Sequence, residues 1–224
     1  MSIQQVMASF GSAGSSPSEP NPYIWYTFDN TLADAMGNNS NATRGAGGAY
    51  TTGDNGFGGS GEATVFNGNA NSVVTIPTFT INPHPAGQCA YTVEFCVYPT
   101  AGNGSTQREL FYYSYLATQS FGALFYDSSV KKVSYYQRGS QAIQSSVTIS
   151  DNAWTRIRFV HEDGVSDRLY FDTGSGFTLV GSESGTHSNE TNVSLNSPKL
   201  GYNFNAFFGR IDEFKVWREA VIPS

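Results

Sequence analysis

The sequence has 224 residues, a formal net charge of −6 and only 13% charged residues, well below the quarter that is usual in globular proteins. The acidic balance argues against nucleic-acid binding, which needs clustered lysine and arginine, and no apolar run of about 18 residues is present to span a membrane. Its 24 glycines, 13 tyrosines and 16 phenylalanines are typical of many short strands and tight turns around an aromatic core.

Residues 1–22 are predicted to form an extended arm and linker, and residues 23–224 to form one domain. Three prolines in the run GSAGSSPSEPNP remove backbone hydrogen-bond donors and favour an extended linker. The start lacks a basic segment followed by a continuous apolar stretch, so no signal peptide is expected. The arm contains four scattered apolar residues, too few for a core, which we interpret as docking contacts for a partner: Ile3, Val6, Met7 and Phe10.

From residue 23 onward, stretches rich in aromatic and β-branched residues alternate with loops rich in Gly, Asn, Ser and Asp. No stretch shows the periodicity of an amphipathic helix. The stretch from Trp154 to Asp172 predicts a hairpin that turns at Asp163–Gly164. The sequence therefore predicts an all-β protein, an antiparallel two-sheet sandwich. Strand alternation predicts that the core contains Tyr26, Phe28, Val93, Phe95, Ile157, Phe159, Phe214 and Val216.

The last predicted strand, FFGRIDEFKVW at residues 207–217, contains a carboxylate in an unexpected place. Strict alternation puts Asp212 on the same face as Phe214, with Ile211 on the opposite face. An unpaired carboxylate in a core costs several kcal/mol. Asp212 is therefore expected to have a cation, hydrogen-bond donors, or a position at the strand end that reaches water.

The order and spacing of several segments resemble the laminin-G-like jelly roll, a branch of the concanavalin A-like lectin/glucanase superfamily. The resemblance covers about residues 23 to 220 and implies a jelly-roll sandwich there. The segments are, in chain order, YTFDNTLADAMGNN, ATVFNGNANSVVTIP, YTVEFCVYPT, AWTRIRFVHEDG with DRLYFD, and FFGRIDEFKVWREA.

The same resemblance implies a structural Ca²⁺ where the first and last strands meet. Asp212 would be one ligand, and an early loop would supply further hard oxygens from Asp29, Asp34 and Asn38. A cation would also remove the cost of the Asp212 carboxylate. The alternative is that Asp212 caps loop amides or pairs with an arginine, and that Asp34 and Asn38 form side-chain turns.

Catalysis is not expected from this sequence. Glycosidases of the wider superfamily use paired carboxylates on one strand face, whereas Glu94 and Glu109 are single carboxylates within their predicted strands. The three histidines are His84, His161 and His187, and we expect them at the surface, in loops or at a strand end. Their spacing matches no metal-binding motif.

Aromatic clusters favour glycan binding instead, because sugar rings stack their C–H faces on exposed tyrosine or tryptophan. The candidate contacts are Tyr112 in FYYSY, Tyr135 in SYYQR and Tyr202 in GYNFNAFF. The alternative is that these side chains pack in the core or at a subunit contact, because alternation puts about half of a strand's aromatic residues inside.

The start MSIQQVMASFGSAG resembles the starts of structural proteins of tailed bacteriophages, notably those of cyanobacterial hosts. The resemblance implies a non-catalytic virion component, a capsid decoration or a tail or fibre protein, that displays a lectin-like jelly roll. Such a protein would be made in the host cytoplasm, be present in many copies, and dock on other virion proteins through its arm. The alternatives are a bacterial cytoplasmic protein, a free lectin or carbohydrate-binding module, and a glycan-cleaving enzyme.

Overall fold

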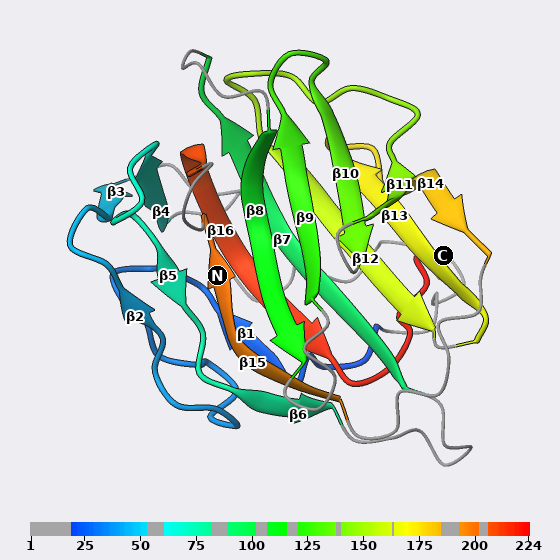
Figure 1. Cartoon of the computed structure of the whole chain (residues 1–224). Coiled ribbons are helices and arrows are strands. Elements are labelled where there is room, and N and C mark those ends of the chain that lie inside the picture. Colours follow the sequence, from blue (N-terminus) through cyan, green and yellow to red (C-terminus); the bar gives the residue numbers. More distant parts are fainter. Residues whose placement is uncertain are drawn as a thin grey trace, which may run out of the picture.

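A computed structural model of the whole chain describes residues 19–52, 61–81, 89–101, 107–115, 121–137, 140–162, 164–184, 193–201 and 206–224. These residues form β-strands and no helix. In the same ranges, therefore, no helix has the length and apolar character that crossing a membrane requires. The strands build two antiparallel sheets stacked face to face as a jelly-roll sandwich (Figure 1). The predicted fold class is confirmed.

Sheet A is an 8-stranded sheet with β7 and β16 near its middle and β14 at one edge. Along the sheet the strands are β14 (Thr178–Glu183), β13 (Ser166–Asp172), β12 (Thr155–Glu162), β7 (Ala90–Pro99), β16 (Phe208–Trp217), β4 (Glu62–Asn67) and β3 (Ala49–Thr52), and β1 (Ile24–Tyr26) also pairs with β16.

Sheet B is also 8-stranded, and Figure 1 looks onto it, with β8, β9 and β10 in front. Its strands, in spatial order, are β11 (Ser140–Gln144), β10 (Lys132–Gln137), β9 (Phe121–Asp127), β8 (Gln107–Tyr115), β15 (Val193–Leu200), β5 (Val74–Thr75) and β2 (Thr43–Arg44), and β6 (Phe79–Ile81) also pairs with β15.

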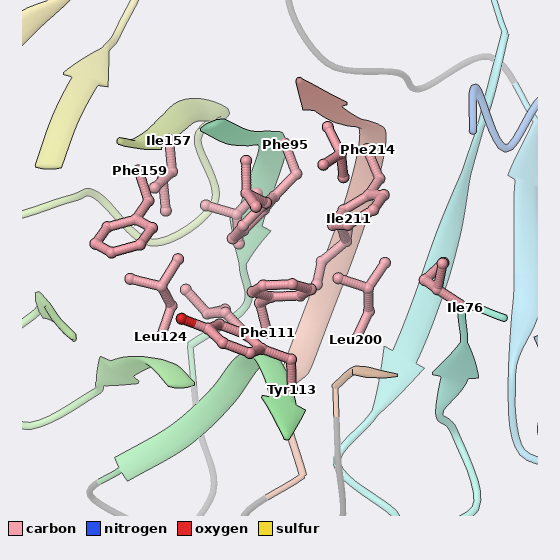
Figure 2. Packing of buried hydrophobic residues seen from close by; sticks show 14 of the residues in the cluster. Ile76, Phe95, Phe111, Tyr113, Leu124, Ile157, Phe159, Leu200, Ile211 and Phe214 are labelled. Carbon is pink, nitrogen blue, oxygen red and sulfur yellow. The ribbon is translucent and has the colours of Figure 1, made fainter. Parts of the chain in front are cut away.

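The core lies between the sheets and is dominated by aromatic rings, as the composition indicated. Phe214 of β16 lies 5.4 Å from Phe111 of β8, and Phe159 of β12 lies 4.2 Å from Tyr135 of β10, measured between ring centroids. Such contacts join the two sheets, and Figure 2 shows part of this packing. The predicted core is confirmed, because each of its members is at most 1% exposed: Tyr26, Phe28, Val93, Phe95, Ile157, Phe159, Phe214 and Val216.

Strand β16 departs from strict alternation at a β-bulge. The step from Asp212 to Lys215 lies opposite a shorter step on β7, and Glu213 adopts a left-handed backbone conformation with φ of 54°. As a result Ile211 and Phe214 both point into the core (Figure 2). The prediction that Asp212 shares the face of Phe214, with Ile211 opposite, is therefore wrong, because the extra residue shifts the alternation.

Both described ends of the chain lie against the outer face of sheet A. The indole nitrogen of Trp217 donates a hydrogen bond to the Pro20 carbonyl oxygen at 2.7 Å. The Thr92 hydroxyl donates to the Glu219 carbonyl at 2.9 Å and accepts from the Val221 amide at 2.8 Å. The outer face of sheet B therefore lies on the opposite side of the sandwich from the described ends.

Candidate functional site

Among the side chains that the structure describes, three half-buried aromatic ones lie on neighbouring strands of the outer face of sheet B. Tyr112 of β8, Phe125 of β9 and Tyr136 of β10 point outward because they alternate with core residues. Tyr112 and Tyr136 are each paired with Ala123 of β9, so a small side chain separates the two tyrosines. We call Tyr112, Ala123, Phe125 and Tyr136 the platform.

Tyr136 is held in place by contacts on several sides. Its hydroxyl accepts a hydrogen bond from the side-chain amide of Gln107 at 2.8 Å and donates one to Gln141 at 3.1 Å. Its ring meets Phe125 edge to face, with centroids 5.0 Å apart. Since the ring is already ordered, a ligand that stacks on it avoids most of the cost of immobilising a side chain.

Glu109 of β8 borders the platform and lies directly opposite Phe125. Burial raises the pKa of its carboxyl from the ordinary 4.5 to about 7, although the nearby Lys199 ammonium lowers it. The Oε2 atom is buried and has no hydrogen-bond partner among the described residues. The platform thus combines stacking surfaces with one carboxyl group that titrates near neutrality.

The raised pKa of Glu109 predicts a pH-dependent gain in stability on its replacement. The folded protein holds the proton on Glu109 more tightly than the unfolded chain does. The stability that this tighter proton binding contributes is full below pH 4.5 and is lost as the pH rises through about 7. Glu109→Gln stays neutral, and we expect it to raise the melting temperature more at pH 8.5 than at pH 4.5. Glu219→Gln, at an exposed position, is the matched control. An equal effect of Glu109→Gln at both pH values would contradict the assignment.

Comparison with known families accounts for the fold. The family described as the concanavalin A-like lectin/glucanases superfamily matches residues 67–224, which is most of the chain. The chain belongs to this superfamily. None of the curated proteins compared with the sequence matches it.

Solved structures share the concanavalin A-like fold with this chain at low sequence identity. Domain 4 of AbnA, a GH43 extracellular arabinanase from Geobacillus stearothermophilus solved in complex with arabinotriose, has a TM-score of 0.66 and 22% identity, covering 91% of this chain and 95% of that domain. The binding domain of Paraclostridial Mosquitocidal Protein 1 gives 0.64 and 18%, covering 90% and 50%. The botulinum neurotoxin serotype G binding domain gives 0.65 and 12%, covering 90% and 49%. The chain thus spans about half of the two toxin structures, and these likenesses establish the fold.

The three tyrosines predicted to contact a glycan do not share one location in the structure. Tyr112 lies on the platform. Tyr135 is fully buried, and its hydroxyl lies 3.1 Å from that of Tyr113, so the prediction that Tyr135 contacts a ligand is wrong and its alternative, core packing, holds. Tyr202 lies outside the described residues. The sequence reasoning missed Phe125 and Tyr136, although adjacency of Tyr135 and Tyr136 requires that they point to opposite faces.

Asp34 is the centre of the early loop, where the sequence predicted calcium ligands. Its Oδ1 accepts hydrogen bonds from the Trp25 and Met36 amides at 2.8 and 3.1 Å. Its Oδ2 accepts from the Asn38 and Asn39 amides at 2.8 and 2.9 Å. Four backbone donors therefore surround this carboxylate, as the side-chain-turn alternative describes.

The other side chains that the sequence predicted as calcium ligands also form hydrogen bonds within the protein. Asp29 accepts a hydrogen bond from the Glu62 amide at 2.9 Å, and the Asn38 side chain donates to the Tyr23 carbonyl at 2.9 Å. Asp212 lies on the outer face of sheet A and accepts from the amide of its bulged neighbour. No three His, Cys, Asp or Glu side chains in the described ranges are grouped to hold a metal ion. The predicted set does not fit a calcium shell, and chelation with EDTA tests calcium binding itself.

The outer face of sheet A is crowded with paired charges. Arg158, only 2% exposed, donates from Nε to Glu94 Oε2 at 2.7 Å and also pairs with Glu19 near the chain start. Arg156 pairs with Asp172. Although burial raises the pKa of the Asp172 carboxyl, hydrogen bonds from Arg156 and from the amides of the following turn hold that pKa below its usual value. These pairs are structural, because they join strands and chain ends.

His161 is not at the surface, where the sequence placed it. It is fully buried in β12, because it lies two residues from Phe159 and so shares the inner face of the strand. Its Nδ1 lies 2.7 Å from Asp167 Oδ1, and its ring centroid lies 4.8 Å from that of Tyr91. The surface prediction for His161 is therefore wrong. His84 and His187 lie outside the described residues.

Proposed function

We propose that this protein binds neutral glycans through the platform without cleaving them. The observation that carries the proposal is the placement of Tyr136, which Gln107 and Gln141 fix beside Tyr112 and Phe125 on the outer face of sheet B. Aromatic faces stack on the C–H faces of sugars, while amides and carboxylates hydrogen-bond to their hydroxyl groups. The similar fold of an arabinanase domain solved with arabinotriose supports this substrate class.

The carboxyl groups near the platform support binding rather than hydrolysis. Glycosidases place two carboxyl groups on either side of the scissile bond. Asp127, the carboxylate on β9 closest in register to Glu109, accepts hydrogen bonds from the amide and hydroxyl of Ser129 at 2.9 and 2.6 Å in the turn after β9. The Asp127 carboxylate is thus engaged within its own turn, so no catalytic pair with Glu109 is proposed.

A glycan array with two matched variants tests the proposal. We expect wild-type protein to bind neutral oligosaccharides, with arabinotriose included as one probe, and Tyr136→Ala to weaken binding about tenfold or more, as loss of a central tyrosine does at other interfaces. Trp154→Ala removes a half-buried aromatic residue that packs on Tyr98 of sheet A and should leave binding unchanged. Melting curves establish that both variants fold. No glycan binding, or equal loss in both variants, would refute the platform.

We further propose that a virion displays this domain. Other virion proteins would hold the arm through Ile3, Val6, Met7 and Phe10, which lie outside the described residues. The fixing of Glu19 and Pro20 on the outer face of sheet A supports this arrangement. An arm attached on that side leaves the platform on the opposite side, facing away from the support.

Deleting residues 2–16 tests display separately from binding. The truncated domain should fold and bind glycans normally but should not be incorporated into particles, as measured by mass spectrometry of purified virions. Normal incorporation of the truncated protein, or absence of the full-length protein from virions, would refute the display role and leave the platform proposal standing.

A further inference from the structure

Glu109 is placed to contact a ligand that stacks on the platform. It shares the outer face of β8 with Tyr112 and lies directly opposite Phe125 of β9. Its buried Oε2 atom has no hydrogen-bond donor in the part of the chain that the structure describes. A buried polar atom without a partner is unfavourable, and it is more so when the group is charged. Glu109 as a whole is only half-buried, so a ligand can bring a donor to its carboxyl group, and it then gains more than a hydrogen bond in water would give.

The charged groups around Glu109 do not hold its carboxyl in one ionisation state, so a bound ligand can shift that state. Lys199 of β15 is the neighbour that acts on it electrostatically, while the Asp127 carboxylate is engaged by Ser129. Arg108, the residue before Glu109, is directed to the Ala206 carbonyl at 2.9 Å. Besides Glu109, the charged and titratable residues on its own and neighbouring strands are Arg108, Tyr112, Tyr113 and Tyr115 on β8, Tyr126 and Asp127 on β9, Lys132, Tyr135 and Tyr136 on β10, and Lys199 on β15.

We propose that the ionised Glu109 carboxylate accepts hydrogen bonds from the hydroxyl groups of a neutral glycan on the platform, so that glycan affinity rises with pH through neutrality. This inference rests on the function proposed above and identifies the Glu109 carboxylate as the group that recognises the hydroxyls of the glycan. It also assigns the ligand class, since a carboxylate at this position repels anionic sugars. Glu109 is a specificity residue and takes part in no reaction.

The direction of the pH effect follows from the two protonation states. Burial raises the pKa of Glu109 to about 7 in the free protein, so the carboxyl is mainly protonated at pH 5.5 and mainly ionised at pH 8.5. A hydroxyl donor binds a carboxylate more strongly than a neutral carboxyl, because hydrogen bonds to charged groups are the stronger kind. Binding therefore favours the ionised form and releases protons at pH 7. The difference between the two kinds of hydrogen bond corresponds to about five- to tenfold in affinity.

The test is a neutral-glycan array at pH 5.5 and pH 8.5, followed by calorimetric titration of the best-bound oligosaccharide at both pH values. Wild-type protein should bind about five- to tenfold more tightly at pH 8.5. Calorimetry at pH 7 in buffers with different ionisation enthalpies should show proton release on binding. Glu109→Gln should bind equally at both pH values and release no protons, and Glu219→Gln should behave as wild type.

The outcomes separate this inference from the proposed function. Binding at both pH values with equal affinity, or tighter binding at pH 5.5, overturns the role of Glu109 and leaves the platform intact. A glycan affinity that still depends on pH in Glu109→Gln also overturns the role of Glu109. Absence of binding at either pH overturns the proposed function, and this inference with it. The proton-release measurement on wild-type protein holds even where the variant fails to fold.

Discussion

Replacing Arg158 with methionine is expected to lower the free energy of unfolding by about 3 to 5 kcal/mol, the usual cost of removing one partner of a buried ion pair. Arg158 and Glu94 are each 2% exposed, and Arg158 binds Glu94 through both Nε and Nη2. Its guanidinium also lies 4.3 Å from the Phe177 ring centroid and 5.3 Å from that of Trp217. The substitution would leave the Glu94 carboxylate buried with only more distant cations.

The double variant Glu94→Met with Arg158→Met is the control. A buried pair replaced by apolar residues is often nearly as stable as the original pair, so the double variant should be more stable than Arg158→Met alone. Urea denaturation measures all three proteins. A single variant within about 1 kcal/mol of wild type, the range of an exposed pair, would show that the pair is less buried than described.

Asp34→Ala is expected to lower the free energy of unfolding by about 3 kcal/mol, the worth of one or two charge-assisted hydrogen bonds. The substitution leaves the amides of Trp25, Met36, Asn38 and Asn39 without their acceptor. Trp25 belongs to β1, so the loss also loosens the loop from sheet A. Thermal and urea denaturation measure the effect.

Two comparisons separate this capping role from calcium binding. Asp29→Ala removes a single acceptor at an exposed position and should cost much less than Asp34→Ala. Because amides already surround the Asp34 carboxylate, EDTA should leave the melting temperature of wild-type protein unchanged. A bound ion at about 100 times its Kd would stabilise the fold by about 2.7 kcal/mol. A clear drop in melting temperature on chelation would therefore favour calcium.

Much of the fold follows from alternation in the sequence. In β7, Val93 and Phe95 alternate with Thr92 and Glu94, and the apolar pair lies in the core as expected. Glu94 is nevertheless buried, because Arg158 and the chain ends cover the outer face of sheet A. Burial on an outer face depends on what packs over it, and strand periodicity carries no information about that.

The errors share a physical origin in local backbone geometry and register. The bulge at Glu213 depends on a left-handed backbone conformation that the sequence does not announce, and it reverses the faces of Ile211 and Asp212. Tyr135 and Tyr136 are chemically identical neighbours, so composition could not decide which one faces solvent. The choice is made by register, which places Tyr135 against Phe159 across the sandwich.

The platform as a whole could not be predicted, because it joins residues from strands that are distant in sequence. Gln107 and Tyr136 are 29 positions apart and meet through one hydrogen bond. Their contact depends on the pairing of β8 with β9 and of β9 with β10. The unusual ionisation of Glu109 likewise reflects burial beside Phe125, and only the assembled sheet provides that burial.

The most direct test of the central claim is a chemical-shift map of the isotope-labelled protein during titration with the neutral oligosaccharide that binds best on the array. The platform account predicts perturbations that cluster on the outward residues of β8, β9 and β10, including Tyr112, Phe125 and Tyr136. Perturbations that cluster instead on the outer face of sheet A, around Tyr98 and Trp154, would contradict it.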